Sequence, residues 1–191
     1  MSKRLDRRTF IQNTAAGVGA LGMGTILKDA NGDITNPGPG EIPKRNFGNT
    51  GIKLSTIGFG GIVVKNAEQS HANKVVAEAF ERGVNYFDVA PSYGNAEIKL
   101  GPALEPYRKD VFLACKTQQR TKEKAQAELN QSLKNLRTDH FDLYQLHAIT
   151  DTKEDVDKVF AKGGAMEVFL EAKRSGKVRF LGFSAHSQDA G

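Results

Sequence analysis

The stretch from Asn85 to Gly94 places an acid and a phenol close together behind an apolar segment. Val84 to Asp88 is rich in β-branched and aromatic residues, which predicts a strand, and a proline and a glycine that follow predict a loop. Asp88 would then end the strand, with Tyr93 five residues further on in the loop. In parallel α/β folds the catalytic groups gather at this end of the strands.

Two other apolar runs end in polar side chains that complement this pair. The run that begins at Val111 ends at Lys116, and the run that begins at Phe141 ends at His147. Because side chains alternate along a strand, the carboxylate, ammonium and imidazole can share one face and one rim. A free tyrosine has a pKa of about 10, which a neighbouring ammonium lowers, and a carboxylate keeps that ammonium charged. A tyrosine tuned this way can give a proton to a carbonyl oxygen as hydride reaches the carbon, while the histidine orients the carbonyl.

Alternating strands and helices are predicted around these residues. Strands are predicted over Leu54–Phe59, Val84–Asp88, Val111–Lys116, Phe141–His147 and Val178–Ser184, and helices over His71–Arg82, Ala96–Leu104, Lys122–Leu136 and Ala165–Arg174. A tight turn at Phe47–Gly51 predicts a short β-hairpin before them. The alternation predicts an α/β fold whose parallel sheet is covered by helices. The first strand lacks a Gly-x-Gly-x-x-Gly turn, which favours a (β/α)₈ TIM barrel over a doubly wound sheet.

Several of these segments resemble the aldo-keto reductases in sequence and in order. They are Phe47–Gly61, Asn85–Glu97, Ala114–Thr117, Leu143–His147 and Lys177–Ser184. The resemblance implies an oxidoreductase on a (β/α)₈ barrel that uses NADPH, or NADH, to reduce a small-molecule aldehyde or ketone. About five of the eight strand–helix units are present, so we expect an incomplete, C-terminally truncated barrel.

The resemblance also implies a role for individual residues. Tyr93 would be the general acid and base, Asp88 and Lys116 would tune it, and His147 would orient the substrate. Ser184 matches a position that holds the nicotinamide carboxamide. The family usually has asparagine after this serine, whereas this chain continues Ala185-His186, so His186 is a candidate substitute for that contact.

Two alternatives to a reductase follow from the same residues. The first is a non-catalytic subunit or sensor that binds a nicotinamide cofactor on the same scaffold. The second is a barrel enzyme of another chemistry, such as a hydrolase that uses Asp88 and His147. Retention of both Tyr93 and Lys116 favours the reductase.

Composition removes several other classes of function. The formal charge of +5 comes mainly from the first 30 residues, and no basic stripe with interleaved aromatic residues follows, so nucleic acid is not an expected partner. Cys115, the only cysteine, lies in an apolar strand and reads as a small hydrophobic residue. His71 and His140 have no carboxylate or cysteine at ligand spacing, so no metal site is expected. The sequence leaves the oligomeric state open.

The first 30 residues read as an export signal. Paired arginines, Arg7 and Arg8, precede a weakly apolar run from Thr14 to Leu27 of about fourteen residues, shorter than the roughly 20 that span a bilayer. This pattern resembles a bacterial twin-arginine signal, so we expect the export machinery as a partner and a periplasmic or otherwise exported protein. Without cleavage the segment would remain as a membrane anchor. We therefore divide the chain into a signal segment (1–30), a linker (31–44) and a partial aldo-keto reductase barrel (45–191).

Overall fold

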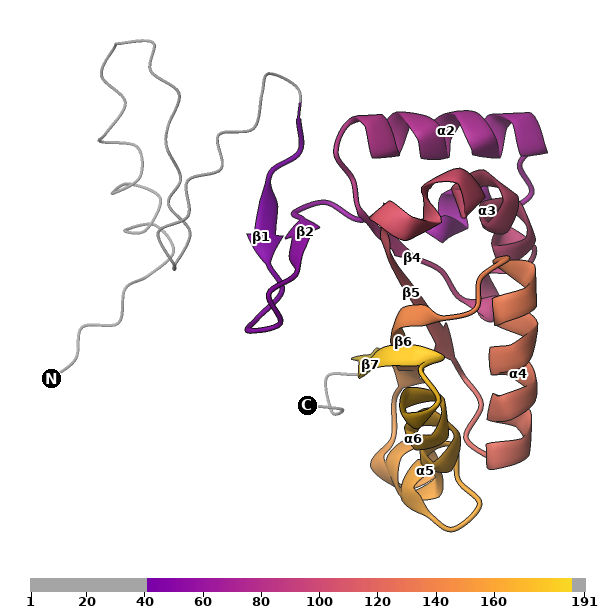
Figure 1. The fold of residues 1–191 in the computed structure, drawn as a ribbon. Helices are drawn as coiled ribbons and strands as arrows, with labels where there is room; N and C mark the ends of the chain where they lie inside the picture. The colour runs from indigo at the N-terminus through magenta and orange to yellow at the C-terminus, as the bar shows by residue number, and fades with distance from the viewer. Residues whose placement is uncertain (1–40, 187–191) are drawn as a thin grey trace, which may run out of the picture. The chain divides into compact units, whose positions relative to one another are not determined.

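The computed structural model describes residues 41–186, which form seven strands and a series of helices (Figure 1). The strands are β1 (Lys44–Asn46), β2 (Lys53–Ser55), β3 (Phe59–Gly60), β4 (Tyr86–Asp88), β5 (Phe112–Thr117), β6 (Phe141–Ile149) and β7 (Val178–Ala185). The α-helices are α2 (Gln69–Glu81), α3 (Ala96–Leu104), α4 (Lys122–Asn135), α5 (Lys158–Phe160) and α6 (Met166–Arg174). Short 3₁₀ turns occur at η1 (Gly61–Val64), η2 (Pro91–Tyr93) and η3 (Glu105–Asp110), and a π-helical turn at η4 (Thr152–Asp157).

The predicted signal segment, residues 1–30, and most of the predicted linker lie outside the described residues. Within residues 41–186, no helix combines the length and the apolar character needed to cross a membrane.

Strands β3 to β7 form one parallel sheet in which each strand pairs with the next one in the chain. Ala114 of β5 lies opposite both Asp88 and Leu143, and Leu143 lies opposite Phe180. Because every right-handed crossover advances in the same direction, the helices all fall on one side of the sheet (Figure 1). A doubly wound sheet would instead reverse its order and carry helices on both faces. The topology is that of part of a (β/α)₈ barrel, the alternative that the missing Gly-x-Gly-x-x-Gly turn favoured.

The first barrel strand differs from its prediction over Leu54–Phe59. Residues 53–55 form β2, which pairs antiparallel with β1 so that Lys44 lies opposite Ser55, and only Phe59 and Gly60 join the barrel sheet. Residues 53–55 pair within the hairpin because β1 is close in sequence and provides an antiparallel partner through a short turn. The side chain of Asn85 then ties the hairpin to β4, accepting from Ser55 N at 2.7 Å and donating to Lys53 O at 2.9 Å.

The two faces of the sheet bury different groups. The face beneath the helices carries fully buried apolar side chains, such as Phe87 and Leu113. On the other face, Phe47 from the hairpin turn packs edge-on against Phe112 and Phe180, with ring centroids 5.6 Å and 5.8 Å apart. Both partners lie near the amino ends of their strands, so aromatic packing occupies that end of the face. The carboxyl end is left for polar groups.

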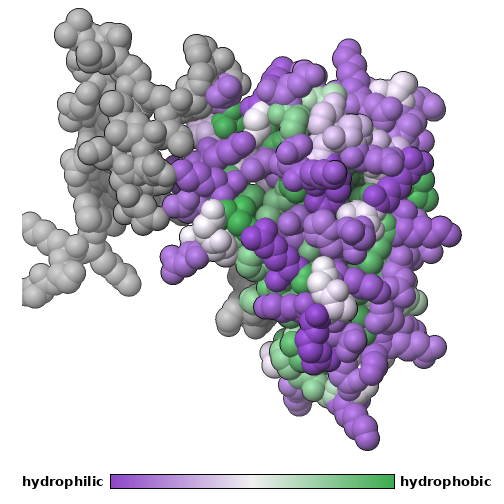
Figure 2. Space-filling model, in the orientation of Figure 1, coloured by the Kyte–Doolittle hydropathy of each residue, from purple (hydrophilic) through white to green (hydrophobic). Residues whose placement is uncertain are grey.

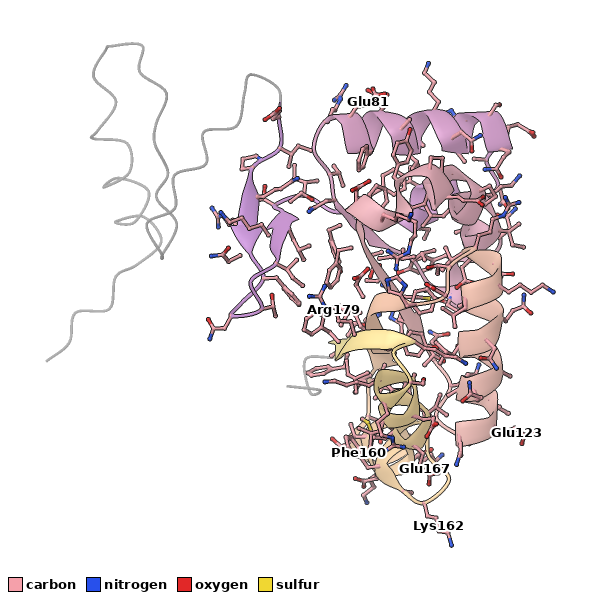
Figure 3. All side chains as sticks on the ribbon, in the orientation of Figure 1. Glu81, Glu123, Phe160, Lys162, Glu167 and Arg179 are labelled. Atoms are coloured by element: carbon pink, nitrogen blue, oxygen red, sulfur yellow. The ribbon has the colours of Figure 1, made fainter. Side chains whose placement is uncertain are left out.

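Helix α4 shows how the helices cover the sheet. Ala125, Leu129 and Leu133 are buried on one side of the helix. Glu123 on the same helix points away from the sheet (Figure 3). Most of the surface in Figure 2 is hydrophilic, which fits amphipathic helices that turn their charged faces to water.

Helix α3 approaches the end of α4 closely enough to require a glycine. A Cβ on Gly101 would lie 2.2 Å from the carbonyl oxygen of Asn135 and 2.9 Å from the Cα of Leu136. Both are backbone atoms, so they cannot yield as a side chain would. A Cβ at this position could be accommodated only if the two helices moved apart.

Replacing Gly101 with alanine should therefore destabilise the protein, although alanine is intrinsically favoured over glycine in a helix by about 1 kcal/mol. Overpacking of this kind costs roughly 1–3 kcal/mol, so we expect the melting temperature to fall by several degrees. Gly60→Ala is the matched control, because a Cβ there meets nothing within 4 Å and the residue has a φ of −78°. Equal melting temperatures for the two variants would contradict the close approach of the helices.

Candidate active site

Three polar groups predicted at strand ends, and a tyrosine predicted in a loop, lie together at the carboxyl end of the sheet. Asp88 is the last residue of β4, Lys116 lies one residue before the end of β5, and His147 lies two residues before the end of β6. Tyr93 ends the 3₁₀ turn that follows β4. The parallel register explains the gathering, because it aligns the ends of neighbouring strands.

Lys116 and Asp88 form an ion pair at the centre of this group. Their side chains are only 8% and 21% exposed, and the lysine Nζ donates to the carboxylate Oδ1. Burial by itself would lower the pKa of Lys116, but the hydrogen bond and the charge of Asp88 outweigh it, so this pKa lies above its ordinary value. Lys116 is therefore a cation at neutral pH, in a place where an unpaired ammonium would be costly.

Tyr93 contacts both the cation and the histidine. The Nζ of Lys116 is 5.4 Å from the centre of the tyrosine ring. The ring meets that of His147 edge-on, with the centroids 6.2 Å apart. Gly94, which follows, has a φ of +65°, a conformation that favours glycine, so the turn that carries Tyr93 depends on it.

His147 is 6% exposed and is held through its ring. Its Nδ1 lies 2.8 Å from the Oγ of Ser184 on β7, and His186 packs edge-on against it at 5.1 Å between centroids. Burial lowers the pKa of His147 most, followed by the positive charge of Lys116 and by His186. The imidazole is therefore neutral at pH 7, with one nitrogen that donates and one that accepts.

These contacts connect all six residues predicted from the sequence. They run from Asp88 through the lysine and the tyrosine to His147, and from there to Ser184 and His186. A small cavity of about 140 Å³ adjoins them. It is lined by Ala90, Pro91, Ser92, Lys116, Gln118, Glu128 and His147. The residues the structure describes contain no cluster of acidic, histidine or cysteine side chains that could hold a metal ion.

Cys115 lies on the opposite face of β5 from Lys116 and takes no part in this group. It is fully buried, and its Sγ lies 3.5 Å from the Oε1 of Glu97. Burial, and then the charge of Glu97, raise the pKa of this thiol well above its ordinary value. It remains protonated, which fits the structural role inferred from its apolar neighbours.

One pair near the site was missed from the sequence. Arg120, in the loop after β5, forms an ion pair with Asp155 of η4, at 3.0 Å between Nε and Oδ1. The two lie 35 residues apart, and Asp155 is one of several acids in a polar stretch. No local spacing links them, because the link depends on the path of the chain between β5 and α6.

The lowered pKa of His147 should make the stability of the protein depend on pH. Below about pH 6.5 the unfolded chain takes up a proton that the folded protein binds only at lower pH, so the free energy of unfolding falls as the pH drops through this range. We expect the melting temperature of the wild type to fall more between about pH 7.5 and 5.5 than that of His147→Gln.

His71→Gln serves as the control, because His71 is exposed on α2. It should keep the pH dependence of the wild type. If His147→Gln kept the same pH dependence as well, the histidine would not be held neutral by its surroundings.

A family profile, described as the aldo/keto reductase family, matches residues 56–190. Among curated proteins, oxidoreductase YqkF of Bacillus subtilis is 31% identical over 156 residues, which cover 74% of this chain and 48% of the relative. L-galactose dehydrogenase of Arabidopsis thaliana is 31% identical over 159 residues, covering 75% and 49%. This chain thus spans about half the length of these relatives.

Solved structures show the same likeness. The holo form of an aldo-keto reductase from Bacillus halodurans superimposes with a TM-score of 0.65 at 30% identity, over 76% of this chain and 51% of that one. An aldo/keto reductase from Brucella melitensis gives a TM-score of 0.61 at 27% identity, over 78% and 56%.

Proposed function

Because this chain belongs to the aldo/keto reductase family, we propose that it is a nicotinamide-dependent oxidoreductase that interconverts an aldehyde or ketone and its alcohol. The observation that carries the proposal is the buried Lys116–Asp88 pair placed against Tyr93, with neutral His147 also in contact with the ring. A phenol beside a permanent cation and a neutral imidazole is suited to moving one proton.

The residues at the end of β7 fit one end of a nicotinamide cofactor. Ser184 offers a hydroxyl and exposed His186 an imidazole, both next to His147. Together they provide a donor and an acceptor, which is what a carboxamide requires. We propose that these two residues hold the carboxamide of NADPH or NADH. The bound cofactor supplies the hydride.

The protein's own residues then manage the proton. Tyr93 gives its hydroxyl proton to the carbonyl oxygen, and the positive charge of Lys116 stabilises the phenolate that remains. Asp88 keeps the ammonium charged and in place. His147, being neutral, does not compete as an acid, and its ring N–H is free to orient the carbonyl. In the direction of alcohol oxidation, the phenolate takes the proton back.

Tyr93→Phe should remove most of the reductase activity of the full-length protein, because it deletes the transferred proton and little else. Loss of a general acid costs about 10²–10⁴-fold in rate. The measurement is oxidation of NADPH, and separately of NADH, with a reactive aldehyde. Binding of the cofactor should be retained, since the proposed carboxamide contacts lie on β7.

Tyr107→Phe is the matched control. Tyr107 of η3 stacks on Phe80 of α2, with ring centroids 4.5 Å apart, and Tyr107→Phe should retain the wild-type rate. Normal turnover by Tyr93→Phe would refute the proton path. A wild-type protein that binds the cofactor but reduces no carbonyl would instead be a binding subunit or sensor.

We also propose that the enzyme leaves the cytoplasm by the twin-arginine route. The support is the sequence of the first 30 residues, with Arg7 and Arg8 before an apolar run. This route carries folded proteins, so a cofactor bound in the cytoplasm could travel with its enzyme.

Replacing both arginines with lysine should block export, because the route recognises the arginine pair and not its charge. In a bacterium with this pathway, cell fractionation should show the variant in the cytoplasm and the wild type in the periplasm or membrane. Equal distribution of the two would contradict the signal.

A further inference from the structure

The backbone immediately after His147 adopts a conformation that needs support. Ala148 has a φ of +56°, in the left-handed region that non-glycine residues rarely occupy. The pairing of β6 with β7 also shifts register between Leu146 and Ile149. Such a conformation is strained and persists only where the surroundings hold it. The strand is therefore irregular directly after the residue that carries the imidazole.

Arg120 supplies that support from the loop after β5. Its Nη2 donates to the carbonyl oxygens of His147, at 2.9 Å, and of Ala148, at 3.4 Å. Its Nε donates to Asp155 Oδ1 at 3.0 Å. The side chains of Arg120 and Asp155 are only 14% and 15% exposed. One rigid guanidinium thus joins two backbone carbonyls to a carboxylate on a third segment, which a lysine could not do.

Asp155 is itself fixed by the loop that follows β6. Its second oxygen accepts from the backbone N–H groups of Thr150, at 2.7 Å, and Asp151, at 3.0 Å, and from the Thr150 hydroxyl at 3.1 Å. Burial would raise the pKa of Asp155, but these donors and Arg120 hold it below its ordinary value. The carboxylate is therefore charged throughout the neutral range, and the ion pair is permanent there.

We propose that Arg120 and Asp155 are positioning residues for catalysis, which hold the His147–Ala148 backbone so that the imidazole stays between Ser184 and Tyr93. The ring of His147 is tied to β7 by a single hydrogen bond, so its place depends on where its own backbone lies. The catalytic part of this inference rests on the proposed reductase activity. The conformational part does not.

The catalytic test is Arg120→Lys, which keeps the positive charge but removes the planar guanidinium that binds the carbonyls and the carboxylate together. A misplacement of about 1 Å can cost up to 10²-fold in rate, so we expect kcat to fall at least tenfold. The KM for the reduced cofactor should stay within about twofold, because the proposed carboxamide contacts on β7 are untouched. Arg174→Lys makes the same change in an exposed ion pair with Glu171 and should match the wild type.

The conformational test reads the imidazole directly and needs no activity. The chain has only four histidines, so ¹⁵N spectra of the full-length protein can follow the ring of His147 as the pH changes. The charged and titratable groups that act on this ring are Lys116, His186, Asp88 and Arg120. We expect Arg120→Lys, Arg120→Met and Asp155→Asn all to shift or broaden its ring signals.

The lysine variant separates the two ways in which Arg120 can act. If only its charge mattered, Arg120→Lys would leave the pKa and the signals of His147 as in the wild type, while Arg120→Met would raise that pKa. This result would overturn the proposal, as would unchanged signals in all three variants. If the wild type reduces no carbonyl with either cofactor, the reductase proposal fails, and the spectra alone decide whether Arg120 and Asp155 hold the ring.

Discussion

The ion pair between Lys116 and Asp88 is the interaction on which the site depends. An ammonium that is 8% exposed would lose its charge or destabilise the fold without a partner, and the carboxylate at the end of β4 provides one. The pair fixes a positive charge against Tyr93, where it can stabilise a phenolate. The pKa of neighbouring His147 is lowered first by burial, and the ammonium of Lys116 lowers it further because it would repel an imidazolium.

The pair in turn depends on the register of a parallel sheet. Asp88 lies opposite Ala114, so Lys116 is two residues further along β5 on the same face and reaches back to the carboxylate. The amino end of this face is occupied by aromatic rings, including Phe47 from the hairpin. Packing at one end and charge at the other allow a single sheet face to provide stability and chemistry together.

A second layer of interactions holds the histidine. Ser184 binds the ring from β7, while Arg120 binds the backbone carbonyl of His147 and is itself held by Asp155 of η4. Ser184, Arg120 and Asp155 do not carry the proton in the proposed mechanism. They determine the position of His147, the residue proposed to orient the substrate. The unusual φ of Ala148 marks the place where this support is needed.

The sequence alone determined most of the elements and the members of the site. Periodicity located every helix and strand that is long and regular, and polar residues at strand ends identified Asp88, Lys116 and His147, because parallel strands must align their carboxyl ends. Only the tertiary structure decided that residues 53–55 belong to the hairpin, since an antiparallel partner and a barrel strand compete for the same apolar run. It alone also paired Arg120 with Asp155, because residues 35 positions apart meet only after the intervening β6 strand has entered the sheet.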